Sequence, residues 1–194
     1  TPATVALFIA SNLIVSALFG YGSFSEASVQ NSALALFYFA FGLPAFALIK
    51  VFSSFFFARQ DTKTPFYISL VSVLLNVIIS VTLFQKLGFI IIPIATSISS
   101  WLNAIALYIF SRKRKFFIFN DIFIYRFPRI LFSSLITGLI FYFLLDLLNF
   151  KLIYSESLKL VYLLLCISIT LICYLLISIF TKAFKMSDIK LNYK

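Results

Sequence analysis

The sequence of 194 residues contains no histidine, two cysteines and six acidic residues, and each shortage removes a class of function. Without histidine, the chain lacks the commonest metal ligand and the usual proton shuttle near neutral pH. Cys166 and Cys173 are separated by about 10 Å along one predicted helix, which is too far for a disulfide bond. Because paired carboxylates within an apolar segment, clustered metal ligands and a glycine-rich phosphate loop are also absent, we predict neither an enzyme nor a metal cofactor.

Charge is scarce as well. Charged residues make up 11% of the chain, hydrophobic residues 62%, and the mean hydropathy is +1.08. A soluble domain carries roughly 25% charged residues. Apolar runs of about 20 residues recur along the chain, and each is long enough to cross a bilayer core of about 30 Å as a helix. Because these runs do not alternate apolar and polar positions as barrel strands do, we predict an all-α, polytopic membrane helical bundle.

Six apolar segments are predicted, at residues 3–19, 32–58, 66–84, 89–110, 130–148 and 158–180. They suggest a block of four transmembrane helices at 1–110, a basic loop at 111–129, two further helices at 130–181 and a basic tail at 182–194. The loop mixes basic with aromatic residues, which suits either a linker that fixes topology or a segment lying among lipid headgroups.

The basic residues indicate how the segments are oriented. Twelve of the 16 lysines and arginines fall in connections on one side, and three fall on the other. The positive-inside rule therefore places the first side, with both ends of the chain, in the cytoplasm. This distribution argues against a nucleic-acid groove. Because the chain starts at Thr1 and enters an apolar segment at once, we expect it to be the C-terminal piece of a longer protein.

The remaining basic residue, Lys50, lies inside the second apolar segment, about 13 Å along the helix axis from Arg59. A lysine stem can snorkel over only part of that distance. Lys50 is therefore either a structural cation, which reaches the interface or pairs with a carboxylate, or a cation facing a substrate cavity. Pro44 in the same segment removes a backbone hydrogen bond, which predicts a kink and a carbonyl that neighbours or water must satisfy.

The second segment ends in a charged turn at residues 59–64, followed by Pro65. Asp61 can pair with Arg59 or Lys63, or cap the next helix. The same three residues also suit a gate on the cytoplasmic side of a transporter, so both interpretations stay open.

The third and fourth segments carry polar residues at helical spacing. Asn76 lies on the first of these polar faces and Thr96 on the second. The two faces predict helices that meet and form hydrogen bonds to each other in lipid. Alternatively, the oxygens of Asn76 and Thr96 could bind a cation, since hard cations favour such ligands.

The stretch GLPAFALIKVFSSFFFARQDTKTP, residues 42–65, resembles the hallmark segment of the MviN/MurJ family of lipid II flippases, within the MOP exporter superfamily. In that family a helix with an embedded lysine runs into a similar turn. The resemblance implies that the chain is the last six helices of a fourteen-helix flippase. Such a protein moves lipid-linked peptidoglycan precursor from the inner to the outer leaflet of the bacterial inner membrane by alternating access.

The resemblance also implies partners and site residues. They are lipid II or a similar undecaprenyl-diphosphate-linked sugar, membrane lipids and the missing N-terminal lobe, with Lys50 supporting the substrate head group. The two C-terminal helices would border a groove for the lipid tail. Some members bind sodium with an additional carboxylate, but here the helical neighbour of Asn76 is Ser80, so the coupling ion, sodium or proton, stays open. The alternatives are a flippase for another polysaccharide-lipid intermediate and a non-transporting membrane scaffold.

Overall fold

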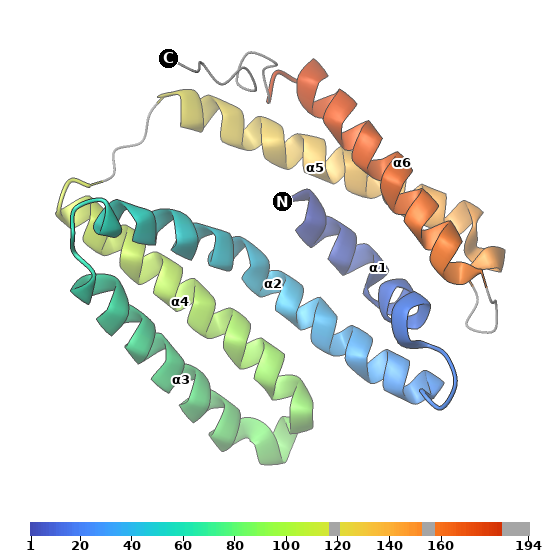
Figure 1. Ribbon diagram of the computed structural model, residues 1–194, viewed down its shortest axis with the longest axis horizontal. Helices are drawn as coiled ribbons and strands as arrows, with labels where there is room; N and C mark the ends of the chain where they lie inside the picture. Colours follow the sequence, from blue (N-terminus) through green and yellow to red (C-terminus); the bar gives the residue numbers. More distant parts are fainter. Residues whose placement is uncertain (117–120, 153–157, 184–194) are drawn as a thin grey trace. The chain divides into compact units, whose positions relative to one another are not determined.

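The computed structural model describes residues 1–116, 121–152 and 158–183, and this part of the chain is helical without strands (Figure 1). Its α-helices are α1 (Pro2–Phe19), α2 (Glu26–Phe57), α3 (Lys63–Leu87), α4 (Ile91–Lys113), α5 (Asp121–Leu147) and α6 (Lys159–Phe180). Two short 3-10 turns follow α3 and α5, namely η1 (Gly88–Ile90) and η2 (Asn149–Lys151). The predicted all-α bundle is confirmed, and each predicted apolar segment corresponds to one of these helices.

Within the described residues, five helical stretches are long and apolar enough to cross a membrane. One of them, Lys63–Lys113, contains α3, η1 and α4 and folds back on itself as a hairpin (Figure 1). The turn is made at Gly88, whose φ of 63° is a left-handed conformation that glycine adopts without steric cost. The hairpin accounts for two of the six predicted segments.

Helix α5 begins at Asp121, well before the predicted start at residue 130. Residues 121–129, which the sequence assigned to the basic loop, are therefore helical. Helix α4 likewise continues to Lys113. The physical reason is that charged residues limit the apolar span but not the helix itself, since backbone hydrogen bonding continues beyond the bilayer core. The connection between α4 and α5 is shorter than the predicted loop.

The chain forms two compact units, Thr1–Ala33 with Phe119–Lys194 (unit 1), and Leu34–Ile118 (unit 2). In unit 1, α1 packs against both α5 and α6. The predicted scheme grouped the first helix with the three that follow, whereas its packing partners here are the last two helices. Their shared core consists of Ala10, Ala17, Phe141, Leu145, Leu152, Leu163 and Cys166.

Unit 2 contains most of α2 together with the α3–α4 hairpin. Phe52 and Phe56 of α2 form a buried cluster with Leu107 of α4. Helices α3 and α4 contact each other along their length. The charged turn between α2 and α3 and the carboxyl end of α4 therefore belong to the same unit.

Candidate functional site

The predicted polar faces of α3 and α4 meet as a hydrogen-bonded seam. The Asn76 side chain on α3 donates to the hydroxyls of Thr96 at 3.1 Å and Ser99 at 3.2 Å on α4. Farther along the hairpin, Asn103 donates to the hydroxyl of Ser69 over 3.4 Å. The prediction that these helices meet through their polar stripes is confirmed, and such contacts replace water as the partner of polar groups in lipid.

The structure brings Asn76 and Thr96 together as a hydrogen-bonded pair. The Asn76 amide nitrogen faces Thr96, while the Asn76 oxygen accepts a hydrogen bond from Ser80 at 3.2 Å. The Thr96 hydroxyl itself donates to the carbonyl of Ile92 at 2.8 Å. A cation would need the amide to rotate so that its oxygen faces Thr96. In this structure the seam joins α3 to α4 by hydrogen bonds, and its use as a cation site stays a prediction.

Helix α2 runs through Pro44 as one helix, and α4 binds the backbone of the turn before the proline. The Ser97 hydroxyl donates to the Tyr38 carbonyl at 2.6 Å, and the Trp101 indole donates to the Phe41 carbonyl at 2.9 Å. A β-carbon added at Gly42 would lie 3.1 Å from the Ser97 oxygen, so glycine permits this close approach. Side chains of α4 thus bind the carbonyls of Tyr38 and Phe41, on either side of the Ala40 carbonyl that Pro44 leaves without its helical donor.

Lys50 lies on α2, and its side chain is exposed on this chain. Among the described residues, the ion pair is formed by Asp61 and Arg114, and Lys50 takes no part in it. The structure thus does not pair Lys50 with a carboxylate within the described residues. Its exposure leaves the ammonium group available to an anion, and whether it faces a cavity stays a prediction.

Asp61 is the centre of the charged turn. One carboxylate oxygen accepts a hydrogen bond from the Thr64 backbone N–H at 3.1 Å, and the other accepts one from the Thr64 hydroxyl at 2.8 Å. The same carboxylate forms an ion pair with Arg114, from the end of α4. The backbone and hydroxyl hydrogen bonds from Thr64, with Arg114 adding to them, lower the pKa of Asp61 below its usual value. Asp61 therefore caps α3 and binds α4 at once.

Two arginines and an aromatic ring complete this contact. The Arg59 guanidinium lies 4.4 Å from the centre of the Phe116 ring, and its Nη1 donates to the Phe55 carbonyl at 3.2 Å. Phe116 also packs edge-on against buried Phe56 of α2, with ring centres 5.4 Å apart. We call Phe56, Arg59, Asp61, Thr64, Arg114 and Phe116 the charged cap of unit 2. It fastens the end of α2, the start of α3 and the end of α4.

Helices α2 and α4 end in the same backbone geometry. At the end of α2, the N–H groups of Gln60 and Asp61 donate to the carbonyls of Phe57 and Phe56, respectively, both at 3.0 Å. At the end of α4, Lys115 and Phe116 donate in the same pattern to Arg112 and Ser111 at 3.0 and 2.8 Å. Both are Schellman motifs, which usually have glycine at the left-handed position. Here Gln60 and Lys115 occupy it, with φ of 58° and 57°.

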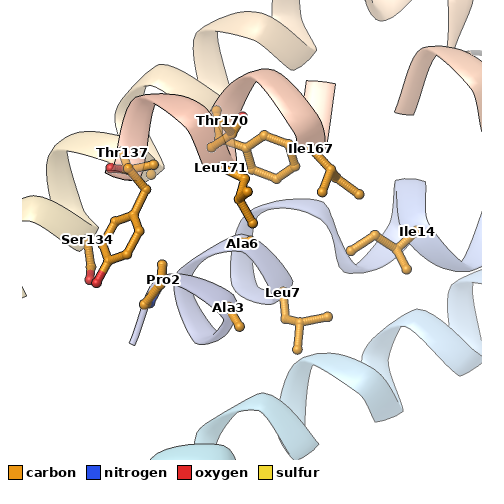
Figure 2. A pocket seen from close by; sticks show the side chains of 13 residues that line it. Pro2, Ala3, Ala6, Leu7, Ile14, Ser134, Thr137, Ile167, Thr170 and Leu171 are labelled. Carbon is orange, nitrogen blue, oxygen red and sulfur yellow. The ribbon is translucent and has the colours of Figure 1, made fainter. Parts of the chain in front are cut away.

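Unit 1 contains an apolar cavity of about 400 Å³ between α1, α5 and α6 (Figure 2). Ala3, Ala6 and Leu7 line it from α1, while Ile167 and Leu171 line it from α6. Helix α5 contributes Ser134, Thr137, Gly138 and Phe141. The Thr137 hydroxyl donates to the carbonyl of Ser133 within its own helix, so it offers no free donor to an occupant. The walls therefore favour an apolar chain rather than a polar group.

Sequence reasoning placed the turn residues correctly but missed their partners. Arg59 and Asp61 do lie together in one cap, whereas the predicted Asp61 pairing with Arg59 or Lys63 is replaced by the pairing with Arg114. Because Arg114 is 53 residues away in sequence, no local pattern could reveal this contact. The residues that line the cavity could not be predicted either, because they are ordinary apolar helix residues from three separate helices.

These features together define a class of protein. The apolar stretches are long enough to span a bilayer, side-chain hydrogen bonds join α3 to α4, and the basic residues of unit 2 other than Lys50 lie at or beside helix ends. This is the architecture of a multi-pass helical membrane protein. A family model described as "Lipid II flippase MurJ" matches residues 1–163, and the chain belongs to this family.

Individual relatives agree with the family match. A "probable lipid II flippase MurJ" of Rickettsia prowazekii is 39% identical over 113 residues, which cover 58% of this chain and 22% of that protein. The protein of the same description from Rhizobium tropici is 34% identical over 139 residues, covering 71% of this chain and 26% of the relative. The chain thus spans about a quarter or less of these curated relatives' length.

A solved structure is similar to this chain in fold. It is described as lipid II flippase MurJ in an inward closed conformation, and it superposes with a TM-score of 0.68 at 25% sequence identity. The match covers 93% of this chain and 36% of the solved chain. The predicted resemblance to the flippase family is confirmed by sequence and by structure.

Proposed function

We propose that this chain is part of a transporter that moves lipid II from the inner to the outer leaflet of the bacterial inner membrane. The observation that carries the proposal is the family match over residues 1–163. The helical fold, with its membrane-length apolar helices and its structural match, supports the same function. The chemistry is movement of a lipid by alternating access, without bond making or breaking, in cooperation with the N-terminal lobe of the protein.

The two units suit different parts of such a substrate. Lipid II joins an anionic diphosphate-sugar head to a long apolar tail. Exposed Lys50 in unit 2 supplies a cation inside an apolar helix, where a diphosphate would be attracted more strongly than in water. The cavity of unit 1, with its apolar walls, suits the tail. Lys50 would therefore support the head group while the tail stays in an apolar environment.

The charged cap supports the proposed orientation, with both chain ends cytoplasmic. Arg59 and Arg114 lie together in it, so the basic connections after α2 and α4 share one end of unit 2. In that position the turn with Arg59, Asp61 and Lys63 would face the cytoplasm and take part in a gate. The coupling ion, sodium or proton, stays open; Asn76 and Thr96 stay the proposed cation site, and sodium binding there would require the Asn76 oxygen to face Thr96.

The proposal is tested by complementation in cells depleted of their own lipid II flippase. The full-length protein that contains this chain is expressed as wild type, Lys50→Leu and Lys50→Arg, with membrane levels matched by immunoblot. We expect wild type to restore growth and Lys50→Leu to fail, because leucine keeps the apolar bulk but lacks the charge. Lys50→Arg should rescue at least partly, since it keeps the cation.

Each other outcome is informative. Rescue by all three proteins would retain lipid II transport but reduce Lys50 to a structural residue. Failure of all three at normal membrane levels would contradict lipid II transport and favour another lipid-linked sugar or a scaffold. Exposed Val51, the next residue on α2, offers a matched control, because Val51→Leu changes an apolar side chain without altering charge.

A further inference from the structure

Lys159, the first residue of α6, is buried although it is charged. The residue is 1% exposed, and the residues that follow it in α6 are mostly apolar. The ammonium group donates a hydrogen bond to the Gly20 carbonyl at 2.7 Å and lies 4.3 Å from the centre of the Tyr21 ring. Gly20 is the residue that ends α1. Lys159 therefore joins the start of α6 to the end of α1.

The chemistry of this contact suits a lysine. The last carbonyls of a helix lack partners within that helix, and a cation is favoured beside them. An aromatic face attracts the same cation. Both contacts gain strength where water is excluded. A methionine of similar length would fill the space but could donate no hydrogen bond, so the buried Gly20 carbonyl would lose its charged partner.

The contact lies at one end of the α1–α6 pair, and the cavity extends toward the other. The start of α6 touches the end of α1, whereas Pro2 and Ala3 at the start of α1 line the cavity with Tyr174 late in α6. The two helices therefore run antiparallel. At the end away from Lys159, α5 is bound to both neighbours, through Ser133 to Thr181 and through Ser134 to Thr1.

We propose that Lys159 is a positioning residue that pins the start of α6 to the end of α1 and so sets the spacing of these two helices where they line the cavity. An apolar chain then enters from the end lined by Pro2 and Tyr174, between α1 and α6. The identity of that chain as a lipid tail rests on the proposed function, while the pinning of α6 does not. Lys159 thus fixes the distance between two cavity walls without touching the occupant.

The first test measures amide hydrogen exchange by mass spectrometry on the full-length protein in lipid nanodiscs. The variants are Lys159→Met and Lys159→Arg, with Lys151→Met as the matched control. Lys151 lies in η2 near the same helix ends and stacks on Phe150 at 5.6 Å, so its loss removes an equal charge from outside the contact. Lys159→Met should speed exchange in the first turn of α6 at least tenfold, Lys159→Arg much less, and Lys151→Met not at all.

A second readout keeps the inference separate from the proposed function. Undecaprenyl diphosphate is added to the same proteins, and its affinity is measured by native mass spectrometry. We expect about a tenfold weaker affinity for Lys159→Met and recovery in Lys159→Arg. If the first turn of α6 loosens but no protein binds the probe, the pinning stands and the lipid-tail function fails. Unchanged exchange in Lys159→Met, or an equal rise in Lys151→Met, would overturn the inference.

Discussion

The two units of this chain hold their helices together by different means. In unit 2, side-chain hydrogen bonds join α3 to α4, an ion pair links the turn before α3 to α4, and donors from α4 reach the backbone of α2. In unit 1, α1 packs on α5 and α6 mainly through apolar and small residues, with Lys159 at one end and two hydroxyl–hydroxyl hydrogen bonds of α5 at the other. Unit 2 therefore contains most of the polar chemistry, while unit 1 contains the apolar cavity.

The difference teaches where each kind of function can be placed. Hydrogen bonds and charges are directional, so they fix helices in a defined arrangement and can orient a polar head group. Apolar contacts are non-directional, so a cavity between such helices tolerates a chain of variable shape. The proposed substrate has a charged head and a long apolar tail, and each of these two properties is found in one unit.

The largest effect is expected from Gly138→Ala in unit 1. A β-carbon at Gly138 would lie 2.4 Å from Cγ1 of Val5, so either the Val5 side chain or the two helices must shift. Overpacking of this kind costs about 1–3 kcal/mol. Thermal unfolding of the purified protein should show a clear loss of stability. Gly42→Ala in unit 2 is the comparison, and we expect a smaller loss there because the closest atom, the Ser97 oxygen, would lie at 3.1 Å rather than 2.4 Å. Equal losses at both glycines would contradict the difference in packing.

The next effect is expected from Asn76→Leu in unit 2. Leucine cannot donate to Thr96 and Ser99, and it also removes the acceptor for Ser80. Hydrogen bonds between membrane helices contribute about 0.6 kcal/mol on average and up to about 1.7 kcal/mol. We expect a loss of about 1–2 kcal/mol in unfolding free energy. Thr82→Val is the control, since Thr82 binds only carbonyls of its own helix. A comparable loss in Thr82→Val would refute a special role for the seam.

A smaller effect is expected from acid on the charged cap. The folded pKa of Asp61 is lowered, first by the hydrogen bonds from Thr64. A depressed pKa means that the carboxylate stabilises the fold above its unfolded pKa near 3.8, and that this contribution is lost as pH falls below that value. Between pH 7 and pH 3, the unfolding temperature of wild type should fall further than that of Asp61→Asn. Parallel curves would show that the Asp61 carboxylate charge contributes nothing to stability.

The smallest effect is expected from Gln60→Gly. Gln60 has a φ of 58° at the end of α2, where a residue with a β-carbon is disfavoured by roughly 1–2 kcal/mol relative to its preferred conformation. Glycine removes this cost but adds freedom to the unfolded chain. We therefore expect a gain in stability of no more than about 1 kcal/mol, measured by thermal unfolding. Gln60→Ala, which keeps the β-carbon, should show no gain, and a loss in both variants would mean that the Gln60 side chain is needed.

Much of the fold could be predicted from the sequence, because long apolar runs and polar stripes are local signals. The polar stripes through Asn76 and Thr96 predicted two helices that meet, and the hydrogen bonds of the hairpin confirm it. Helix ends were less predictable. Arg126 and Arg129 precede the predicted apolar span, which starts at residue 130, yet α5 already begins at Asp121. Charged residues limit an apolar span but do not stop a helix.

The contacts of the candidate sites were harder to predict, because they join residues far apart in sequence. Asp61 could be recognised as a capping residue, but its ion pair with Arg114 depends on how α4 ends. The contact of Lys159 depends on α1, which begins more than a hundred residues earlier, so the sequence around α6 could not reveal it. Pairings of this kind are tertiary facts that single-segment patterns do not contain.

The division between the two units is tested most directly by photo-crosslinking. A lipid II analogue with a photoreactive group in its tail is bound to the full-length protein in nanodiscs, and adducts are mapped by mass spectrometry. The account predicts adducts on the cavity walls of unit 1, at residues such as Ala6, Ile167 and Leu171. Adducts concentrated instead on the exposed apolar face of α3, at Val77, Ile78 and Val81, would contradict it.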